Sequence, residues 1–136
     1  MHVYIGGAHN GKRDYVKKTL ANQDSEWFEG TLPGDSHPHN PDTIQTVVIA
    51  GLEEWLAKTA FSEEDAIAQV LDAVSGRDAV FILTDIGRGI VPIDAGQRQL
   101  RDTCGRLYQR LIAEADEVTR IWYGIPQLVK KRGEVL

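Results

Sequence analysis

The sequence predicts a single three-layer α/β domain, residues 1–136, with a mainly parallel sheet between layers of helices. Two continuous apolar runs, at residues 46–50 and 79–83, are typical of strands covered on both faces of such a sheet. Helix-like segments follow both runs, and strands that alternate with helices are the signature of this class. A length of 136 residues with 42% hydrophobic residues suits one domain with its own core.

The first strand and helix are expected near residues 2–6 and 11–22. A short β-prone run ends in Gly6 and Gly7, which indicates a tight turn at the end of a strand. Apolar side chains then recur near helical spacing. A strand followed directly by a glycine-rich turn and a helix is therefore expected at the start of the domain.

A long loop is expected from Glu29 to Asp42, because this stretch contains three prolines and two glycines. Trp27 and Phe28 predict at most a short extended piece before it. His37 and His39 lie within the loop, where they are interpreted either as solvated side chains or as metal ligands. Structural zinc prefers four ligands, which favours the solvated interpretation.

The run 46–50 is predicted to be a central strand, followed by helices near 52–60 and 62–75. Ser62 is the expected N-cap of the second helix, since its hydroxyl can accept a hydrogen bond from a backbone amide of the first turn. Gly76 is the natural stop of that helix.

A second central strand is expected near 78–84, a long helix near 98–115 and a last strand near 117–123. The helix carries an apolar stripe that includes Cys104, so we expect this thiol to be buried and chemically inert. The basic run at 130–133 is expected to be a solvated end.

Composition excludes several classes of protein. A formal net charge of −5 argues against a nucleic-acid-binding role. No apolar run approaches the ~20 residues that a membrane-spanning helix needs. Cys104 is the single cysteine of the chain, which excludes an intramolecular disulfide and a cysteine-rich zinc site. We therefore expect a cytoplasmic protein without a membrane span.

The turn after the first strand fits the pattern G-x-x-x-x-G-K in the strand-to-helix context that gives this pattern its meaning. The residues concerned, with the one that follows, are Gly6, Gly7, Ala8, His9, Asn10, Gly11, Lys12 and Arg13. Glycines let backbone N–H groups surround phosphate oxygens, and the lysine reaches the terminal phosphates. The pattern predicts a P-loop that binds GTP or ATP, the alternative being a glycine-rich turn with an exposed lysine.

Two further positions bear on catalysis and on magnesium. A P-loop normally continues with Ser or Thr, whose hydroxyl binds Mg²⁺, whereas this chain has Arg13. Arg13 either places a permanent charge near the phosphates or points away as a surface arginine. Asp85 follows a strand at the end where α/β ligands collect, so it is either a magnesium ligand or a loop-capping aspartate. Lys12 and Asp85 are the candidate catalytic residues.

Several segments of the second half together resemble a known enzyme family. Ile82–Pro92 looks like the "VxNEVGxGIVP" segment of the adenosylcobinamide kinase/adenosylcobinamide-phosphate guanylyltransferase family. Leu100–Leu111 resembles the family's "FRDxxGRxNQRLA" helix, residues 113–118 resemble "AAADEVW", and Gly124–Pro126 resembles "SGxP". The similarity is close over residues 79–130.

The first half resembles this family in outline. Gly6–Arg13 is similar to "GGARSGKS", with Arg13 in place of a serine, and Ala50–Leu56 is similar to "DCLTLWL", with Ala50 in place of an acid. In the family, a strand and a helix with a GMP-accepting histidine precede a tryptophan that matches Trp27. The fourteen residues 13–26 contain no histidine.

The resemblance implies a P-loop fold, a homotrimer and a role in cobalamin biosynthesis. The family phosphorylates adenosylcobinamide and then transfers GMP through a histidine phosphoramidate. By resemblance, Lys12 would stabilise the transferred phosphate, the backbone of Gly7–Gly11 would cradle it, and Asp85 would help to hold Mg²⁺. The unmatched histidine argues against guanylyl transfer by this route. A GMP-accepting role for His37 or His39 is a separate hypothesis.

Two alternatives belong to other classes of protein. One is a catalytically inactive nucleotide- or corrinoid-binding protein that regulates cobalamin enzymes, which Arg13, Ala50 and the missing histidine favour. The other is an oligomeric protein whose P-loop binds nothing. Gly6, Gly11 and Lys12, placed between a strand and a helix, count against the second alternative.

Overall fold

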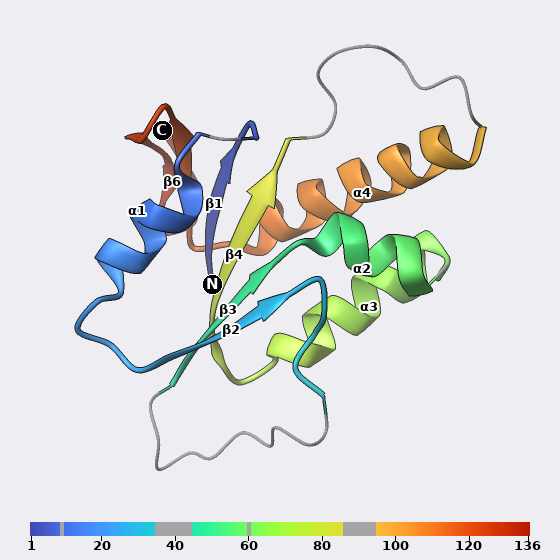
Figure 1. Cartoon of the computed structure of the whole chain (residues 1–136), viewed down its shortest axis with the longest axis horizontal. Coiled ribbons are helices and arrows are strands. Elements are labelled where there is room, and N and C mark those ends of the chain that lie inside the picture. The colour runs from blue at the N-terminus through green and yellow to red at the C-terminus, as the bar shows by residue number, and fades with distance from the viewer. Residues whose placement is uncertain (9, 35–44, 60, 86–94) are drawn as a thin grey trace.

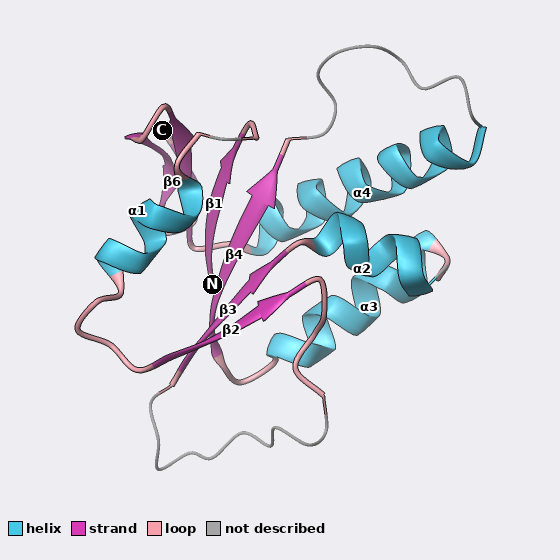
Figure 2. Cartoon of the chain, viewed as in Figure 1, coloured by secondary structure: helices cyan, strands magenta, loops and turns pink. Residues whose placement is uncertain are grey.

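The computed structural model describes residues 1–8, 10–34, 45–59, 61–85 and 95–136 (Figure 1). Seven strands and four helices lie within these ranges, and Figure 2 shows them by type. In chain order they are β1 (His2–Gly6), α1 (Lys12–Thr19), β2 (Ser25–Glu29), β3 (Thr46–Ala50), α2 (Leu52–Thr59), α3 (Glu63–Val74), β4 (Asp78–Thr84), α4 (Ala95–Glu114), β5 (Glu117–Trp122), β6 (Ile125–Lys131) and β7 (Glu134–Val135).

The strands form one sheet in the order β2-β3-β4-β1-β5-β6-β7. All pairs from β2 to β5 are parallel, whereas β6 and β7 are added as antiparallel strands. The predicted α/β class with a mainly parallel sheet is confirmed. β1 lies between β4 and β5, so the turn that follows it opens at the shared carboxyl edge of the parallel strands.

Helices cover both faces of the sheet, which gives the three predicted layers (Figure 1). The larger core packs α2, α3 and α4 against one face, with fully buried side chains that include Phe81 and Leu107. α1 packs on the other face through Val16, over Val48 and Ile82. Burial of apolar side chains on this face explains why the short, polar α1 remains attached, since each fully buried Val or Ile side chain contributes about 1.5–3 kcal/mol.

Local signals explain several helix boundaries. The Ser62 hydroxyl accepts a hydrogen bond from the Asp65 amide at 3.3 Å, which confirms the predicted N-cap of α3. Gly76 has a φ of +72° just beyond the end of α3, as its predicted role as a stop requires. The Cys104 side chain is fully buried on α4, as expected, and burial raises the pKa of its thiol to about 11.

Two predicted boundaries and one predicted loop are corrected. The first helix ends at Thr19 rather than near residue 22, and α4 begins at Ala95, before the expected residue 98. Trp27 and Phe28 belong to a complete strand, β2, which pairs in parallel with β3 from Ser25 to Glu29. β2 is an edge strand with partly exposed side chains, so it lacks the continuous apolar run that marked the central strands.

The predicted solvated end at 130–133 is part of the sheet, in β6 and the turn that follows it, although residues 131–133 are exposed as expected. Tyr123 and Gly124 both have positive φ and connect β5 to β6, and Arg132 and Gly133 do the same between β6 and β7. Two-residue turns with positive φ at both positions match the twist of the strands that they join. In the sequence, the pairs Tyr123-Gly124 and Arg132-Gly133 were the available signal of these turns.

Lys130 within β6 is buried, although it was expected to be solvated. Its Nζ donates hydrogen bonds to the carbonyl oxygens of Ile112 and Ala113, at 3.0 Å and 2.9 Å. These carbonyls lie in the last turn of α4, where the helix dipole favours a positive charge. The lysine therefore joins the antiparallel hairpin to the long helix.

Some predictions fall outside the described residues. His9, His37 and His39, and the segment 86–94 of the expected glycine-rich loop, are among them. In the part of the chain that the structure describes, no helix is long and apolar enough to cross a membrane.

Lys130→Met is expected to lower the free energy of unfolding by about 1–3 kcal/mol, because it leaves two carbonyl oxygens of the last turn of α4 without their charged donor. Urea denaturation followed by circular dichroism measures this change. Lys131→Met, at the exposed neighbouring position, is the control and should change stability by less than about 0.5 kcal/mol. Equal effects of the two substitutions would contradict the capping role of Lys130.

Gly6→Ala is expected to destabilise the fold by about 2–3 kcal/mol, since a Cβ atom at Gly6 would collide with the backbone carbonyl oxygen of Ile121 on β5. Gly105→Ala on α4 is the matched control. An added Cβ there meets nothing within 4 Å, so the higher helix propensity of alanine should stabilise the protein by about 0.5–1 kcal/mol. Thermal and urea unfolding of both variants would test this opposite pair of signs.

Candidate functional site

The candidate site is built around the glycine-rich turn, residues 6–12, which joins β1 to α1. Gly11 precedes the helix with a φ of +80°, a conformation that favours glycine. Its carbonyl oxygen accepts the first helical hydrogen bond from the Tyr15 amide at 3.0 Å. The turn therefore places the amino end of α1, with its partial positive charge, at the carboxyl edge of the sheet.

Lys12 is folded back into this turn. The residue is only 4% exposed, and its Nζ donates a hydrogen bond to the carbonyl oxygen of Gly7 at 2.6 Å. Burial lowers the pKa of Lys12, the nearby Arg13 cation lowers it further, and Glu53 acts in the opposite direction. The alternative of an exposed lysine is wrong. A buried ammonium group at the amino end of a helix is suited to hold an anion.

The hairpin between β5 and β6 supports the glycine-rich turn from the side. The Gly124 amide donates a hydrogen bond to the Asn10 carbonyl oxygen at 2.8 Å. A Cβ atom at Gly11 would lie 3.5 Å from the Gly124 Cα, so the two backbones are close together. The sequence analysis did not foresee this support, because it placed the end of the sheet at the preceding strand.

Asp85 lies beside the turn, as its place after a strand suggested. β4 pairs with β1 up to Thr84 and Gly6, and the next amide, that of Asp85, donates to the Gly6 carbonyl oxygen at 2.9 Å. A cavity of about 250 Å³ lies here between the ends of the strands. Its lining includes Gly7, Asn10, Asp85, Arg120 and Trp122. The structure thus brings the two candidate catalytic residues to the same edge.

Arg13 is directed toward Glu29, the last residue of β2. Its Nε donates to Glu29 Oε1 at 2.9 Å and its Nη2 donates to Oε2 at 3.0 Å, which is a bidentate ion pair. The hydrogen bond from Arg13 lowers the pKa of Glu29, and the same bond raises the pKa of Arg13. Of the two predicted orientations, Arg13 adopts neither fully: it is anchored to the outermost strand and lines a small hollow with Asn10, Gly11 and Lys12.

The acidic first turn of α2 faces these two cations. Glu53 and Glu54 both raise the pKa of Arg13, and Glu53 also acts on Lys12. The carboxylate of Glu53 is held by the Tyr108 hydroxyl of α4, which donates to its Oε2 at 3.2 Å. Ala50, which stands where the family resemblance places an acid, is the last residue of β3. It is fully buried, and its side chain carries no ligand atom.

The described residues do not fit a magnesium site of the kind that a P-loop normally holds. The hydroxyl after the lysine is replaced by the Arg13 guanidinium, and Ala50 supplies no carboxylate. Among the described residues, no group of three or more His, Cys, Asp or Glu side chains is arranged to hold a metal ion. Asp85 as a single magnesium ligand stays a prediction.

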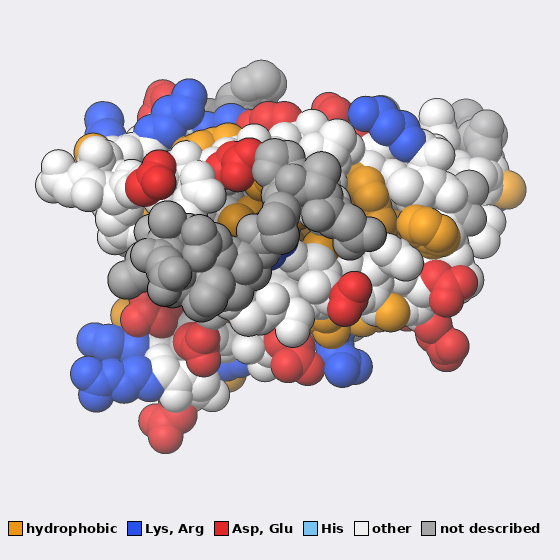
Figure 3. Space-filling model, turned by 90° about the horizontal axis from the view of Figure 1, so that it is seen from below, with side chains coloured by type: hydrophobic (Ala, Val, Ile, Leu, Met, Phe, Trp, Pro, Cys, Tyr) orange, Lys and Arg blue, Asp and Glu red, His pale blue; other side chains and the backbone are white. Residues whose placement is uncertain are grey.

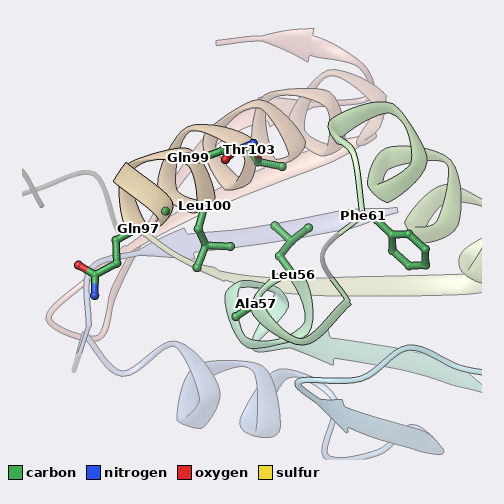
Figure 4. A pocket seen from close by; sticks show the side chains of 8 residues that line it. Leu56, Ala57, Phe61, Gln97, Gln99, Leu100 and Thr103 are labelled. Carbon is green, nitrogen blue, oxygen red and sulfur yellow. The ribbon is translucent and has the colours of Figure 1, made fainter. Parts of the chain in front are cut away.

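A second cavity, of about 500 Å³, lies between α2 and α4. Figure 4 shows Leu56 of α2 and Leu100 of α4 pointing toward one another across it, with Gln97 and Gln99 on the α4 side. Its volume is within the range of small-molecule pockets. The sequence analysis did not identify this cavity, because no motif marks its residues.

Charged side chains of both signs are mixed on the face shown in Figure 3, with hydrophobic side chains between them. An interspersed pattern of this kind differs from the single-sign basic surface that recruits nucleic acid. It agrees with the net charge of −5.

Comparison with known proteins decides the family. A model of the family described as cobinamide kinase / cobinamide phosphate guanyltransferase matches residues 35–129, which is more than half of the chain. The chain belongs to this family. The resemblance seen in the sequence is therefore confirmed, and membership links the protein to cobalamin biosynthesis.

A curated member of the family is the bifunctional adenosylcobalamin biosynthesis protein CobU of Salmonella typhimurium. It is 36% identical over 81 residues, which cover 57% of this chain and 45% of the relative. The chain therefore spans less than half the length of that relative. The range matched by the family model contains Asp85 but begins after the glycine-rich turn, so the turn must be assessed from its own residues.

Glu29→Gln is expected to lower stability at neutral pH by less than about 1 kcal/mol, because solvent screens this exposed pair. The lowered pKa of Glu29 fixes the sign of the pH dependence. The contribution is present above the ordinary value of 4.5 and disappears as the pH falls through the lower folded-state pKa. Urea denaturation of both proteins at low ionic strength should give curves that converge in acid. A difference that persists at the acid end would contradict the ion-pair origin.

Proposed function

We propose that this chain binds a purine nucleotide, GTP or ATP, at residues 6–13 as a P-loop, and that it phosphorylates adenosylcobinamide. The observation that carries the proposal is the buried Lys12, whose Nζ lies 2.6 Å from the carbonyl oxygen of Gly7 within the turn. Family membership supports the substrate class, since the family is described as cobinamide kinase / cobinamide phosphate guanyltransferase.

In this proposal the protein acts mainly by positioning and by charge. The arriving phosphate displaces Gly7 as the partner of Lys12, and the ammonium group gains an anion that compensates for its burial. Backbone amides between Gly7 and Gly11 and the amino end of α1 donate to the phosphate oxygens. Asp85 lines the small cavity beside the turn, together with Gly7 and Asn10.

Guanylyl transfer is not part of the proposal, because the family's histidine has no counterpart in residues 13–26. The alternative is a catalytically inactive nucleotide- or corrinoid-binding regulator. The presence of Arg13 and Ala50 at positions that organise the metal in active P-loop enzymes favours that alternative. Assembly as a homotrimer is a further proposal that rests on the family resemblance, and a cytoplasmic location is one that rests on the composition.

Two measurements test the function. Isothermal titration calorimetry with GTP and ATP is expected to show binding that falls at least about tenfold in Lys12→Met, which removes a charge-assisted contact. Lys18→Met, an exposed cation on the same helix, is the control and should bind like the wild type. Loss of binding in neither variant would contradict the role of Lys12.

Single-turnover transfer then separates the two functions. Protein in excess is mixed with γ-labelled nucleotide and adenosylcobinamide, with Lys12→Met alongside. Label on cobinamide that disappears in the variant supports the kinase. Nucleotide binding without transfer by folded protein supports the regulator, and absence of nucleotide binding overturns both the kinase and a nucleotide-binding regulator.

A further inference from the structure

Resting on the proposed nucleotide binding, we propose that this chain holds nucleotide phosphates without a divalent cation, with the Arg13 guanidinium, oriented by Glu29, at the place of the metal. In a magnesium-dependent P-loop, the residue after the lysine supplies a hydroxyl ligand to the ion. Here that residue is a cation fixed by two hydrogen bonds of 2.9 Å and 3.0 Å. The residue present therefore does not fit the metal ion that a P-loop normally holds.

The position of Arg13 in the first turn of α1 supports this role. Arg13 lies directly after Lys12 in the first turn of α1, and the two residues line one hollow with Asn10 and Gly11. Glu29 engages only Nε and one N–H of Nη2, which leaves the remaining donors of the guanidinium fork for another acceptor. A planar fork matches the oxygens of a phosphate in a way that a lysine does not.

The permanent charge of Arg13 also supports this role. A guanidinium group is permanently charged, and an ion pair with Glu29 keeps it in one orientation before the ligand arrives. Mg²⁺ placed near this cation would be repelled by it, and the repulsion is strongest where protein excludes water. Among the described residues, no group of three or more His, Cys, Asp or Glu side chains is arranged to hold the ion against this repulsion. Arg13 and Lys12 can instead neutralise phosphate oxygens directly.

The glutamates around Arg13 affect how readily an anion approaches the turn. Glu29, Glu53 and Glu54 surround Arg13 electrostatically, so a bare anion would be repelled if the glutamates were not already balanced. Arg13 balances Glu29 through the ion pair, and Tyr108 donates a hydrogen bond to Glu53. The ion pair therefore orients the Arg13 guanidinium, and the Tyr108 hydrogen bond orients Glu53, through protein side chains alone.

The test measures GDP affinity by titration calorimetry in excess EDTA and in millimolar MgCl₂. The wild type is expected to bind with dissociation constants that agree within about twofold in the two buffers, whereas a difference of tenfold or more in favour of magnesium overturns the inference. Absence of binding in both buffers overturns the proposed nucleotide binding, and with it this inference. The two failures are therefore distinguishable.

Variants of Arg13 test the residue itself. Arg13→Gln is expected to weaken GDP binding in EDTA by about tenfold or more, and Arg13→Lys, which keeps the charge but loses the fork, by less. Arg110→Gln removes an exposed arginine that is paired with Glu114 on α4, and serves as the control for general charge effects. Unchanged EDTA-buffer affinity in Arg13→Gln, with the fold verified by circular dichroism, overturns the assignment.

Discussion

The close approach of β1 to β5 at Gly6 determines the arrangement of the carboxyl edge of the sheet. Only a residue without a side chain can lie against the Ile121 carbonyl oxygen at this point. The parallel register from His2 to Ile5 with residues 117–120 then fixes the height at which the β5–β6 hairpin ends. As a consequence, Gly124 reaches Asn10, and the glycine-rich turn is supported from one side by β4 and from the other by the hairpin.

Electrostatic balance at this edge follows from the same constraint. The turn directs Lys12 inward, where burial disfavours its charge, and leaves Arg13 pointing along the edge toward β2. Opposite charges come from different elements, namely Glu29 at the end of β2 and Glu53 in the first turn of α2. The proposed anionic ligand would therefore meet cations that are already oriented, and orientation in advance is what makes charge stabilisation effective.

The central part of the fold could be predicted from the sequence because burial on both faces leaves a continuous apolar run. Thr46–Ala50 and the strand that ends at Thr84 carry this mark, and both lie inside the sheet. Edge strands do not. β2 exposes part of every side chain, and β6 has mostly exposed ones, so neither differs in pattern from a loop. For these strands the decisive information is pairing, which a single sequence does not contain.

The candidate site, like the sheet, could be predicted only in part from the sequence. Residues 6–12 and Asp85 were identified because each stands at a fixed place relative to a strand that the pattern reveals. The Arg13–Glu29 pair was not predictable, because the two residues are sixteen positions apart and meet only when β2 pairs with β3. The burial of Lys12 was missed for a related reason, since it depends on a lysine that folds back onto the carbonyl of Gly7.

Two of the three departures from the family pattern in the first half, Arg13 and the missing histidine, concern α1 and the connection that follows it. By resemblance, the family places an extra strand and a helix with the GMP-accepting histidine after the P-loop helix. In this chain a connection of residues 20–24 leads from α1 directly to β2. The short connection holds no counterpart of the element that carries the histidine, and Glu29 at the end of β2 lies within hydrogen-bond reach of Arg13. Replacement of the serine by arginine is thus accommodated by an acid that the direct connection supplies, which ties the composition of the turn to the architecture of the sheet.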